Sequence, residues 1–394
     1  MPEPDSEPLR LIAVTAFGLE AVVSRELQAL GYADIQVEDG RVLFTADVLG
    51  IARANLWLRS ADRIRLLIGR FEAHDFGQLF DQTRDLPWER WLGRYARFPV
   101  QGRSVRSQLH SVPDCQRIVK KAIVERLKSC YEVEWCDETG VEYPIDVSIL
   151  RDQVTLTIDT SGTALNRRGY RRLTAKAPLR ETLAAALVQL SVWYPDRLFV
   201  DPFCGSGTLP IEAALIARNL APGMNREFTA GQWPQISRGV WEAAMTEARD
   251  LVRPGPDEIL IGTDIDSEVL SLARYHAQQA GVADCIHFQQ RPFAELQSKR
   301  KFGCIVTNPP YGERLSDPAG VEQIYQSMSG VFAPLDTWSV FVLTSYADFE
   351  KRLRRRATRR RKLFNGKLEC TYYQMLGPKP PRLQRRRSDD TVRT

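Results

Sequence analysis

The second half of this 394-residue chain predicts a doubly wound α/β sheet, and the first half predicts smaller α+β units. From residue 179 onward, short apolar runs alternate with helical segments, which is the pattern of a parallel sheet covered by helices. Acidic, glycine or amide residues follow three of these runs directly, at strand ends where open α/β sheets bind ligands. In the first half, Asp39-Gly40 stands between two apolar runs and predicts a β-hairpin.

Two periodicities in the first half predict its strands and helices. Alternating apolar residues indicate strands, and apolar residues three or four apart indicate helices. The expected elements are strand 9–14, helix 18–30, strands 35–38 and 41–45, helix 51–57, strand 63–71, a helix before Trp88, strand 98–109, helix 114–129, and strands 145–150 and 154–159. A sharp change to basic composition over 167–180 marks the boundary with the second half.

The second half predicts alternating strands and helices, interrupted by a loop-rich section over 219–239. The expected elements are helix 179–189, strand 198–200, helices 209–218 and 240–252, strand 258–262, helix 268–280, and strands 286–289 and 302–307. Strands separated by helices of this length are typical of parallel pairing.

Composition excludes several classes of protein. A hydrophobic content of 43% over this length suits about two to three globular domains. No apolar run reaches membrane-spanning length, and the first eight residues are acidic and proline-rich, unlike a secretory signal. We therefore expect a cytoplasmic protein without a membrane partner. The seven cysteines form no C-x-x-C pair and there are four histidines, so neither disulfides nor a metal site is expected.

The segment Asn308-Pro309-Pro310-Tyr311 carries the candidate chemistry, because it directly follows the expected strand 302–307. Asn308 Oδ1 and the Pro309 carbonyl can accept both N–H bonds of a planar exocyclic amine, which draws its nitrogen toward a tetrahedral, nucleophilic form. Tyr311 offers a ring face for stacking. The pattern predicts methyl transfer to such an amine, without a metal or a general base. A plain turn is the alternative, since each of these residues favours turns.

A glycine-containing loop follows strand 198–200. It reads Asp201-Pro202-Phe203-Cys204-Gly205-Ser206-Gly207-Thr208 and leads into the next helix. Its glycines let the backbone approach a ligand, and the helix N-terminus adds a positive dipole end. Pro210 stands where the dinucleotide fingerprint has its third glycine, and no Gly-Lys-Ser/Thr follows, so nucleotide phosphates are not the expected ligand.

Two acidic residues end the strand 258–262. Asp264 is placed to accept hydrogen bonds from ribose hydroxyls. Asp266 is expected to cap the helix that follows, as aspartate readily does.

Two stretches concentrate positive charge. Over 167–180, arginines and a lysine surround Tyr170, which suits phosphate contact with stacking, although a solvated linker is the alternative. The stretch 351–362 carries nine basic residues in twelve, for which phosphate contact is favoured over a purely solvated surface. The candidate RNA-binding residues are Arg167, Arg168, Tyr170, Arg171, Arg172, Lys176, Arg355 and Arg359.

Taken together, the three strand ends resemble those of class I amino-methyltransferases that use S-adenosylmethionine. The runs 55–63 and 159–183 are similar to stretches of THUMP-domain RNA methyltransferases, and 361–370 is similar to the closing hairpin of that family. The resemblance is strongest to the guanine-N2 methyltransferases of large-subunit (23S) ribosomal RNA. It extends from about residue 9 to about residue 385.

The resemblance implies an architecture as well as a fold class. It implies a ferredoxin-like α+β unit over 1–60, a THUMP RNA-binding domain over 61–165, and a Rossmann-like, seven-stranded class I methyltransferase domain over 166–384. The tail 385–394 is expected to be disordered.

The resemblance also implies S-adenosylmethionine as the cofactor, and RNA as the partner. Its cofactor-binding residues carry over to Asp201, Phe203, Cys204, Gly205, Ser206, Gly207, Thr208, Asp264, Ile265, Phe293 and Asn308, and its catalytic residues to Asn308, Pro309, Pro310 and Tyr311. Many class I enzymes place an acid at the third strand end to meet the adenine amino group. Here that position reads Gln290-Arg291-Pro292-Phe293, so Phe293 and the backbone are expected to make this contact.

The implied reaction is methylation of the N2 amine of a guanine in 23S ribosomal RNA. A transfer RNA guanine-N2 methyltransferase, a protein glutamine methyltransferase and a non-catalytic RNA-binding protein are the alternatives. The four-residue motif does not by itself distinguish guanine from adenine, since both exocyclic amines satisfy the same acceptors. Some relatives carry a second, fused methyltransferase domain; this chain ends without one, so a single methylation is expected. The modified nucleotide, naked RNA against an assembling particle, and the oligomeric state stay open.

Overall fold

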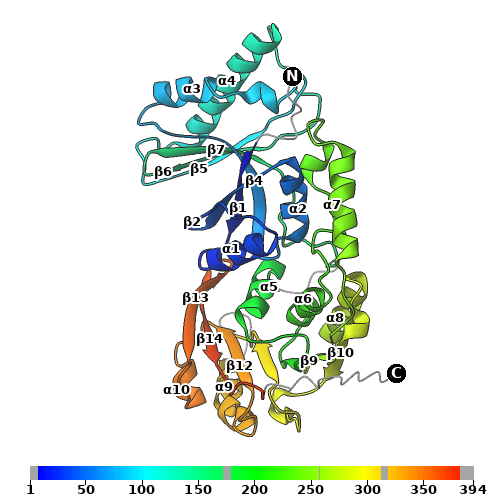
Figure 1. Cartoon of the computed structure of the whole chain (residues 1–394). Coiled ribbons are helices and arrows are strands. Elements are labelled where there is room, and N and C mark those ends of the chain that lie inside the picture. The colour runs from blue at the N-terminus through cyan, green and yellow to red at the C-terminus, as the bar shows by residue number, and fades with distance from the viewer. Residues whose placement is uncertain (1–7, 172–178, 257, 312–317, 382–394) are drawn as a thin grey trace, which may run out of the picture.

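The structure, a computed structural model, describes residues 8–171, 179–256, 258–311 and 318–381. Within these residues it contains two seven-stranded sheets, one from each half of the chain. Figure 1 shows the sheet of the first half above the sheet of the second half. The predicted α/β class is confirmed, as is the seven-stranded sheet of the second half.

The first sheet has the strand order β2-β3-β1-β4-β7-β6-β5. Its strands are β1 (Leu9–Thr15), β2 (Ile35–Glu38), β3 (Arg41–Ala46), β4 (Ala61–Glu72), β5 (Val100–Val105), β6 (Ile145–Leu150) and β7 (Gln153–Asp159). The predicted hairpin is confirmed, since Glu38 pairs with Arg41 across a turn in which Gly40 has a φ of +72°. Its helices are α1 (Glu20–Ala29), α2 (Val48–Trp57), α3 (Phe76–Arg84) and α4 (Val112–Tyr131).

The long strand β4 joins the two α+β units that the sequence predicts. It is 12 residues long and pairs with β1 on one side and β7 on the other. The two units therefore share one continuous sheet. The expected border between residues 60 and 61 falls at the first residue of this shared strand.

The second sheet has the order β10-β9-β8-β11-β12-β14-β13. Its strands are β8 (Phe199–Asp201), β9 (Leu260–Asp264), β10 (Ile286–Gln290), β11 (Cys304–Thr307), β12 (Ser339–Thr344), β13 (Arg359–Asn365) and β14 (Leu368–Met375). The first five of these strands are parallel, and β14 runs antiparallel to both of its neighbours. The carboxyl ends of β8, β9 and β11 therefore meet at one edge, where the strand order reverses direction.

The helices of the second half are α5 (Glu181–Leu190), α6 (Thr208–Ala217), α7 (Arg238–Asp250), α8 (Ser267–Gln279), α9 (Pro318–Phe332) and α10 (Phe349–Leu353). The basic stretch 351–362 is not one helix: it starts in the short α10 and continues into the edge strand β13. Among the described residues, no helix combines the length and the apolar composition needed to cross a membrane.

Residues 219–250 belong to the second half in sequence but pack into the core of the first half. Phe228, Trp233 and Trp241 share a hydrophobic cluster with the first sheet. Trp233 stacks on Tyr143 with ring centroids 4.8 Å apart, and its indole N–H donates to the Glu142 carbonyl. Helix α7 lies alongside α2 (Figure 1), where Arg53 and Glu247 form a two-bond ion pair. The two halves therefore share one core at this seam.

A buried charged cluster ties the linker after β7 to α6. Glu212 has no exposed surface, and Arg168 and Tyr170 are each 3% exposed. The Tyr170 hydroxyl donates to Glu212 Oε1 at 3.1 Å, and Arg168 Nε lies 3.5 Å from the same oxygen. The Arg168 guanidinium also donates to the carbonyls of Leu165 and Arg59. Burial raises the pKa of Glu212.

This cluster corrects the prediction that two residues of the stretch 167–180 bind RNA. Arg168 and Tyr170 face inward, because the buried carboxylate of Glu212 requires a cation and a donor. Neither side chain can reach RNA in this structure. A sequence pattern of alternating basic residues does not report which of them is paired inside the fold.

We predict that Arg168→Met destabilises the protein by about 3 kcal/mol or more, because it removes the cation nearest to the buried Glu212 and leaves only the weaker effect of Arg59. The double variant Arg168→Met/Glu212→Leu is expected to recover part of the loss. The thermal midpoint of each variant measures this. An unchanged midpoint in Arg168→Met would contradict the assignment of the cluster as a stabilising ion pair.

Candidate functional site

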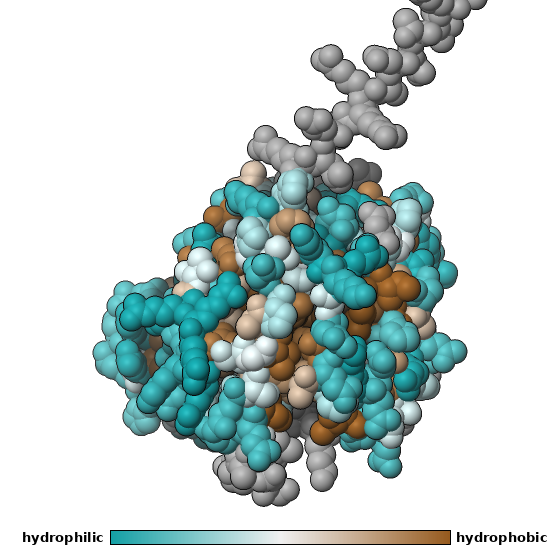
Figure 2. Space-filling model, turned by 90° about the horizontal axis from the view of Figure 1, so that it is seen from below, coloured by the Kyte–Doolittle hydropathy of each residue, from teal (hydrophilic) through white to brown (hydrophobic). Residues whose placement is uncertain are grey.

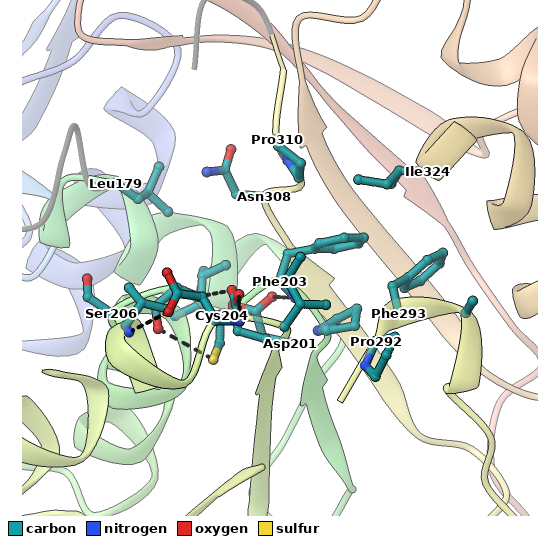
Figure 3. Close-up of a pocket in the computed structure, with 18 of the residues that line it drawn as sticks. Leu179, Asp201, Phe203, Cys204, Ser206, Pro292, Phe293, Asn308, Pro310 and Ile324 are labelled. Atoms are coloured by element: carbon teal, nitrogen blue, oxygen red, sulfur yellow. Dashed lines mark hydrogen bonds between the residues drawn. The ribbon is translucent and has the colours of Figure 1, made fainter. Parts of the chain in front are cut away.

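A cavity of about 690 Å³ opens at the carboxyl ends of β8, β9 and β11. Figure 3 shows Asn308 and Pro310 on one side of it, with Asp201, Phe203 and Cys204 on the other. The predicted cofactor residues that line it are Asp201, Phe203, Cys204, Gly205, Ser206, Thr208, Asp264, Ile265, Phe293 and Asn308. The fold therefore brings residues more than a hundred positions apart to one cavity.

Asp201 and Thr307 connect the two strands at the reversal point. The Thr307 hydroxyl donates to Asp201 Oδ1 at 2.6 Å, and the Phe203 N–H donates to the same oxygen at 3.2 Å. Asp201 is 1% exposed, and this burial raises the pKa of its carboxyl to about 7. The hydrogen bonds hold the ends of β8 and β11 in register, one bearing the glycine loop and the other bearing Asn308.

The glycine loop places its two glycines in different roles. Gly205 has a φ of +50°, and a Cβ built there would meet no atom within 4 Å, so this part of the backbone is open toward the cavity. Gly207 has a φ of +83°, and its Cβ would stand 3.0 Å from Ala273 and from the ring of Phe288. It does not line the cavity. Gly207 is thus required for close packing of α6 against α8 and β10.

Asp264 holds the loop through its carboxylate. Its Oδ2 accepts the N–H of Gly205 at 2.9 Å, and its Oδ1 accepts the N–H of Asp266 at 3.1 Å. Burial raises the pKa of Asp264. Asp266 Oδ1 accepts the N–H groups of Glu268 and Val269, which confirms it as the cap of α8. Contact between Asp264 and a ribose stays a prediction.

Aromatic rings form one wall of the cavity. Phe203 and Phe293 lie 4.8 Å apart at their centroids, tilted by 30°, and Phe293 also packs edge to face on Phe332 of α9. Pro292 and Ile265 add apolar surface beside them. Such a wall can hold a flat heterocycle without an acidic partner, in keeping with the expected role of Phe293.

Helix α9 supplies a wall that sequence reasoning missed. The residues of α9 that line the cavity are Gly320, Gln323, Ile324 and Ser327. Leu179, before α5, also lines the cavity. The spacing of three, one and three residues places those of α9 on one helical face. That periodicity was the available signal, but only the structure shows what the face covers.

Asn308 lies at the cavity wall with an unused acceptor. Its Oδ1 is buried and has no hydrogen-bond donor among the residues that the structure describes. Pro310, two residues further on, is held through its carbonyl, which accepts the Tyr325 hydroxyl at 3.2 Å. Tyr325 is itself bonded to Thr344 at the end of β12, with the oxygens 2.7 Å apart. The motif backbone is therefore fixed, while the Asn308 oxygen is left free to accept.

The structure does not place Pro309 and Tyr311 on the cavity wall. Tyr311 is 1% exposed, and its hydroxyl accepts the Asn365 amide N–H at 3.0 Å. Stacking of a base on this ring stays a prediction, since the residues that follow it, 312–317, lie outside the described ones.

The predicted RNA-binding residues fall into three groups. Arg167, Arg355 and Arg359 are exposed, and Figure 2 shows hydrophilic side chains gathered on the side of the molecule where α10 lies. Arg171 is a further correction, because its guanidinium bonds to the Leu179 carbonyl and the Thr208 hydroxyl and pairs with Glu181 at 3.3 Å. Arg172 and Lys176 lie outside the described residues.

Three family models match the chain in the order of its domains. They are the RlmL ferredoxin-like domain over 10–65, the THUMP domain over 73–159, and the RMKL-like methyltransferase domain over 168–374.

Individual proteins are similar over nearly the whole chain. The "Putative RNA methyltransferase YpsC" of Bacillus subtilis is 49% identical over 366 residues, which are 92% of this chain and 95% of that protein. The "Ribosomal RNA large subunit methyltransferase K/L" of Shewanella pealeana is 33% identical over 92% of this chain, which spans about half of that protein's length, 52%. The crystal structure of "SMU.472, a putative methyltransferase complexed with SAH" is 42% identical, with a TM-score of 0.90, covering 95% of this chain and 100% of that one.

We predict that Asp201→Asn changes how stability depends on pH. The ordinary pKa of the carboxyl is 3.8 and the folded value is about 7, so the folded protein binds more protons between these values and its stability falls as pH rises through this window. Relative to the parent protein, Asp201→Asn should gain stability from pH 4 to pH 7, by at most roughly 4 kcal/mol. Unfolding midpoints measured across this range check it. A difference that is constant with pH would contradict a neutral, buried carboxyl.

Proposed function

Because this chain belongs to the RlmK/L family of RNA methyltransferases that use S-adenosylmethionine, we propose that it methylates the N2 amine of a guanine in 23S ribosomal RNA. The observation that carries methyl transfer to an exocyclic amine is the buried, unbonded Oδ1 of Asn308 at the cavity wall. A buried polar atom without a partner costs free energy in the folded protein. Its retention at this place is explained if a ligand supplies the missing N–H.

An exocyclic amine provides that N–H. Its lone pair is delocalised into the ring, so the nitrogen is a poor nucleophile until its geometry changes. Asn308 Oδ1 accepts one N–H, and the Pro309 carbonyl is proposed to accept the other. Two fixed acceptors favour the tetrahedral nitrogen and stabilise the positive charge that grows on it as the bond to carbon forms. The remaining contribution is positioning.

The residues of the cavity fit S-adenosylmethionine. The open backbone at Gly205 suits the close approach of its methionine portion, and the Asp264 carboxylate suits ribose hydroxyls. The rings of Phe203 and Phe293 suit the adenine. The cofactor supplies an electrophilic methyl group. The chain's own residues hold the two reactants and exclude water.

The domain order supports RNA as the substrate. A THUMP domain precedes the methyltransferase domain, and Arg355 and Arg359 remain exposed to contact phosphates. We propose the division 1–60, 61–165 and 166–384 for the three domains, with 385–394 as a tail that lies outside the described residues. Ribosomal RNA is favoured over transfer RNA by the K/L relatives, which are named for the large ribosomal subunit.

Adenine satisfies Asn308 as well as guanine does, so guanine rests on the family alone. A protein glutamine side chain fits the same acceptors, but it leaves the THUMP domain without a role. If the chain were a non-catalytic RNA-binding protein, the cavity and the unbonded Asn308 oxygen would have no role.

The direct test is to identify the methylated nucleoside. Purified protein is incubated with methyl-labelled S-adenosylmethionine and total RNA from a strain whose gene for this protein is deleted. N2-methylguanosine from the large ribosomal RNA is expected. The same nucleoside from transfer RNA would identify transfer RNA as the substrate. N6-methyladenosine would show that the target base is adenine and not guanine. Absence of label in RNA, despite cofactor binding, would reject the proposal for free RNA.

We predict a division of roles between Asn308 and Asp264. Asn308→Ala should lower kcat by roughly 100-fold or more, because an acceptor used in the transition state is lost, with little change in cofactor affinity. Asp264→Asn should weaken cofactor binding, since a charged acceptor becomes a neutral one. Calorimetric titration with S-adenosylhomocysteine and steady-state kinetics separate the two effects. Equal loss of cofactor affinity in both variants would count against the assignment.

We also predict that Tyr325→Phe lowers kcat by roughly 10-fold while cofactor affinity stays unchanged. The substitution removes the donor to the Pro310 carbonyl and so loosens the backbone that positions Asn308. Tyr346→Phe is the matched control, because Tyr346 stacks on Tyr325 with centroids 4.3 Å apart but bonds to Glu322 instead. Equal losses of kcat in both variants would point to general packing.

A further inference from the structure

An exposed aromatic ring lies where the two halves of the chain meet. Phe17, in the loop between β1 and α1, is 52% exposed. Its ring packs edge to face on Phe364 in β13, with centroids 6.3 Å apart. Figure 1 shows α1 directly above β13 at this place. A single exposed phenylalanine is ordinary, so its meaning depends on how it is held and on what surrounds it.

The loop that carries Phe17 is held rigidly. The Glu20 carboxylate accepts the N–H of Gly18 at 2.9 Å and the N–H of Gly40 at 2.9 Å. Gly18 has a φ of +90°, and a Cβ there would stand 2.8 Å from the Lys362 carbonyl. The Arg361 guanidinium donates to the Gly18 carbonyl at 3.2 Å. The ring is therefore presented in one place, which lowers the entropy cost of binding.

The ring lies at the same edge of the second sheet as the candidate active site. Phe364 precedes Asn365, whose amide donates to the Tyr311 hydroxyl, and Tyr311 ends the motif that begins at Asn308. In the strand order, β13 is three positions from β11. Three strand spacings are roughly 14 Å. A few nucleotides of a single strand span that distance.

Positive charge accompanies the ring. The Lys362 ammonium lies 5.6 Å from the centroid of Phe364 and pairs with Glu369 at 2.6 Å. Lys367, at the turn between β13 and β14, is exposed and has no ion-pair partner among the described residues. An exposed ring beside cations is complementary to unpaired bases and their phosphates.

We propose that Phe17, with Lys362 and Lys367, binds a single-stranded RNA segment that flanks the target nucleotide. The ring stacks on an unpaired base, and the two ammonium groups contact phosphates. This surface combines the ferredoxin-like unit with the closing hairpin of the methyltransferase domain. The inference rests on the proposed function, because it names how the RNA enters the site.

The test uses the full-length protein and a fluorescein-labelled single-stranded 12-nucleotide oligouridylate, with binding followed by fluorescence anisotropy at fixed low salt. Phe17→Ala is expected to weaken binding about 10-fold, and to raise the KM for RNA in the methylation assay while cofactor affinity stays unchanged. Phe17→Trp should bind like the parent protein, because it keeps a stacking ring. Tyr194→Ala is the matched control, since Tyr194 is 67% exposed but precedes β8, at the opposite edge of the sheet. Lys367→Glu should weaken binding and lower its salt dependence.

Several outcomes overturn the proposal. One is oligouridylate binding by Phe17→Ala that equals that of the parent protein at an unchanged thermal midpoint, and another is equal loss of binding in Phe17→Ala and Phe17→Trp. A loss confined to methylation of assembled ribosomal particles assigns the ring to a protein partner instead. Ring-dependent binding of RNA without any methylation of RNA supports this surface and rejects the proposed function. Methylation of RNA by Phe17→Ala that equals that of the parent protein supports the proposed function and rejects this surface.

Discussion

The hydrogen bond from Thr307 to Asp201 is the interaction on which the candidate site depends. It joins the ends of the parallel strands β8 and β11 at the point where the strand order reverses. Each of these strands is followed by one loop of the candidate site. The loop after β8 opens at Gly205, and the loop after β11 presents Asn308. Because the bond is buried, its cost in desolvation is offset only when both strands are in register. The cavity and its acceptor are thus consequences of one sheet edge.

The structure fixes the motif 308–311 by hydrogen bonds but leaves the Asn308 oxygen without one among the described residues. Tyr325 and Asn365 satisfy the polar groups of Pro310 and Tyr311, whereas the Asn308 oxygen receives no donor within the described chain. Leaving this oxygen unbonded while its neighbours in the motif are bonded places an unpaired acceptor where a ligand can use it. At the linker after β7 the buried Glu212 carboxylate acts differently, since its contacts hold Arg168 and Tyr170 inside the protein.

The fold and much of the site could be predicted because their signals are local. Strands β1 to β11, the Asp39-Gly40 turn and the cap at Asp266 each follow from a few neighbouring residues, whereas strand β12 was not predicted. Helix α9 escaped prediction, and its cavity-lining face has meaning only beside the sheet that it covers. Gly207 was expected to meet the cofactor, but the nearness of Ala273 and Phe288, which come from other elements, shows that it serves packing.

The sequence by itself determined which residues stand at the ends of the parallel strands, because strand period and turn chemistry are written in consecutive positions. It also determined that positive charge is concentrated in two stretches. Only the tertiary structure decided which of those charges face inward, that Tyr311 is buried, and that residues 219–250 complete the core of the other half. Burial and pairing are set by segments distant in the chain, and a local pattern of residues carries no record of its partners.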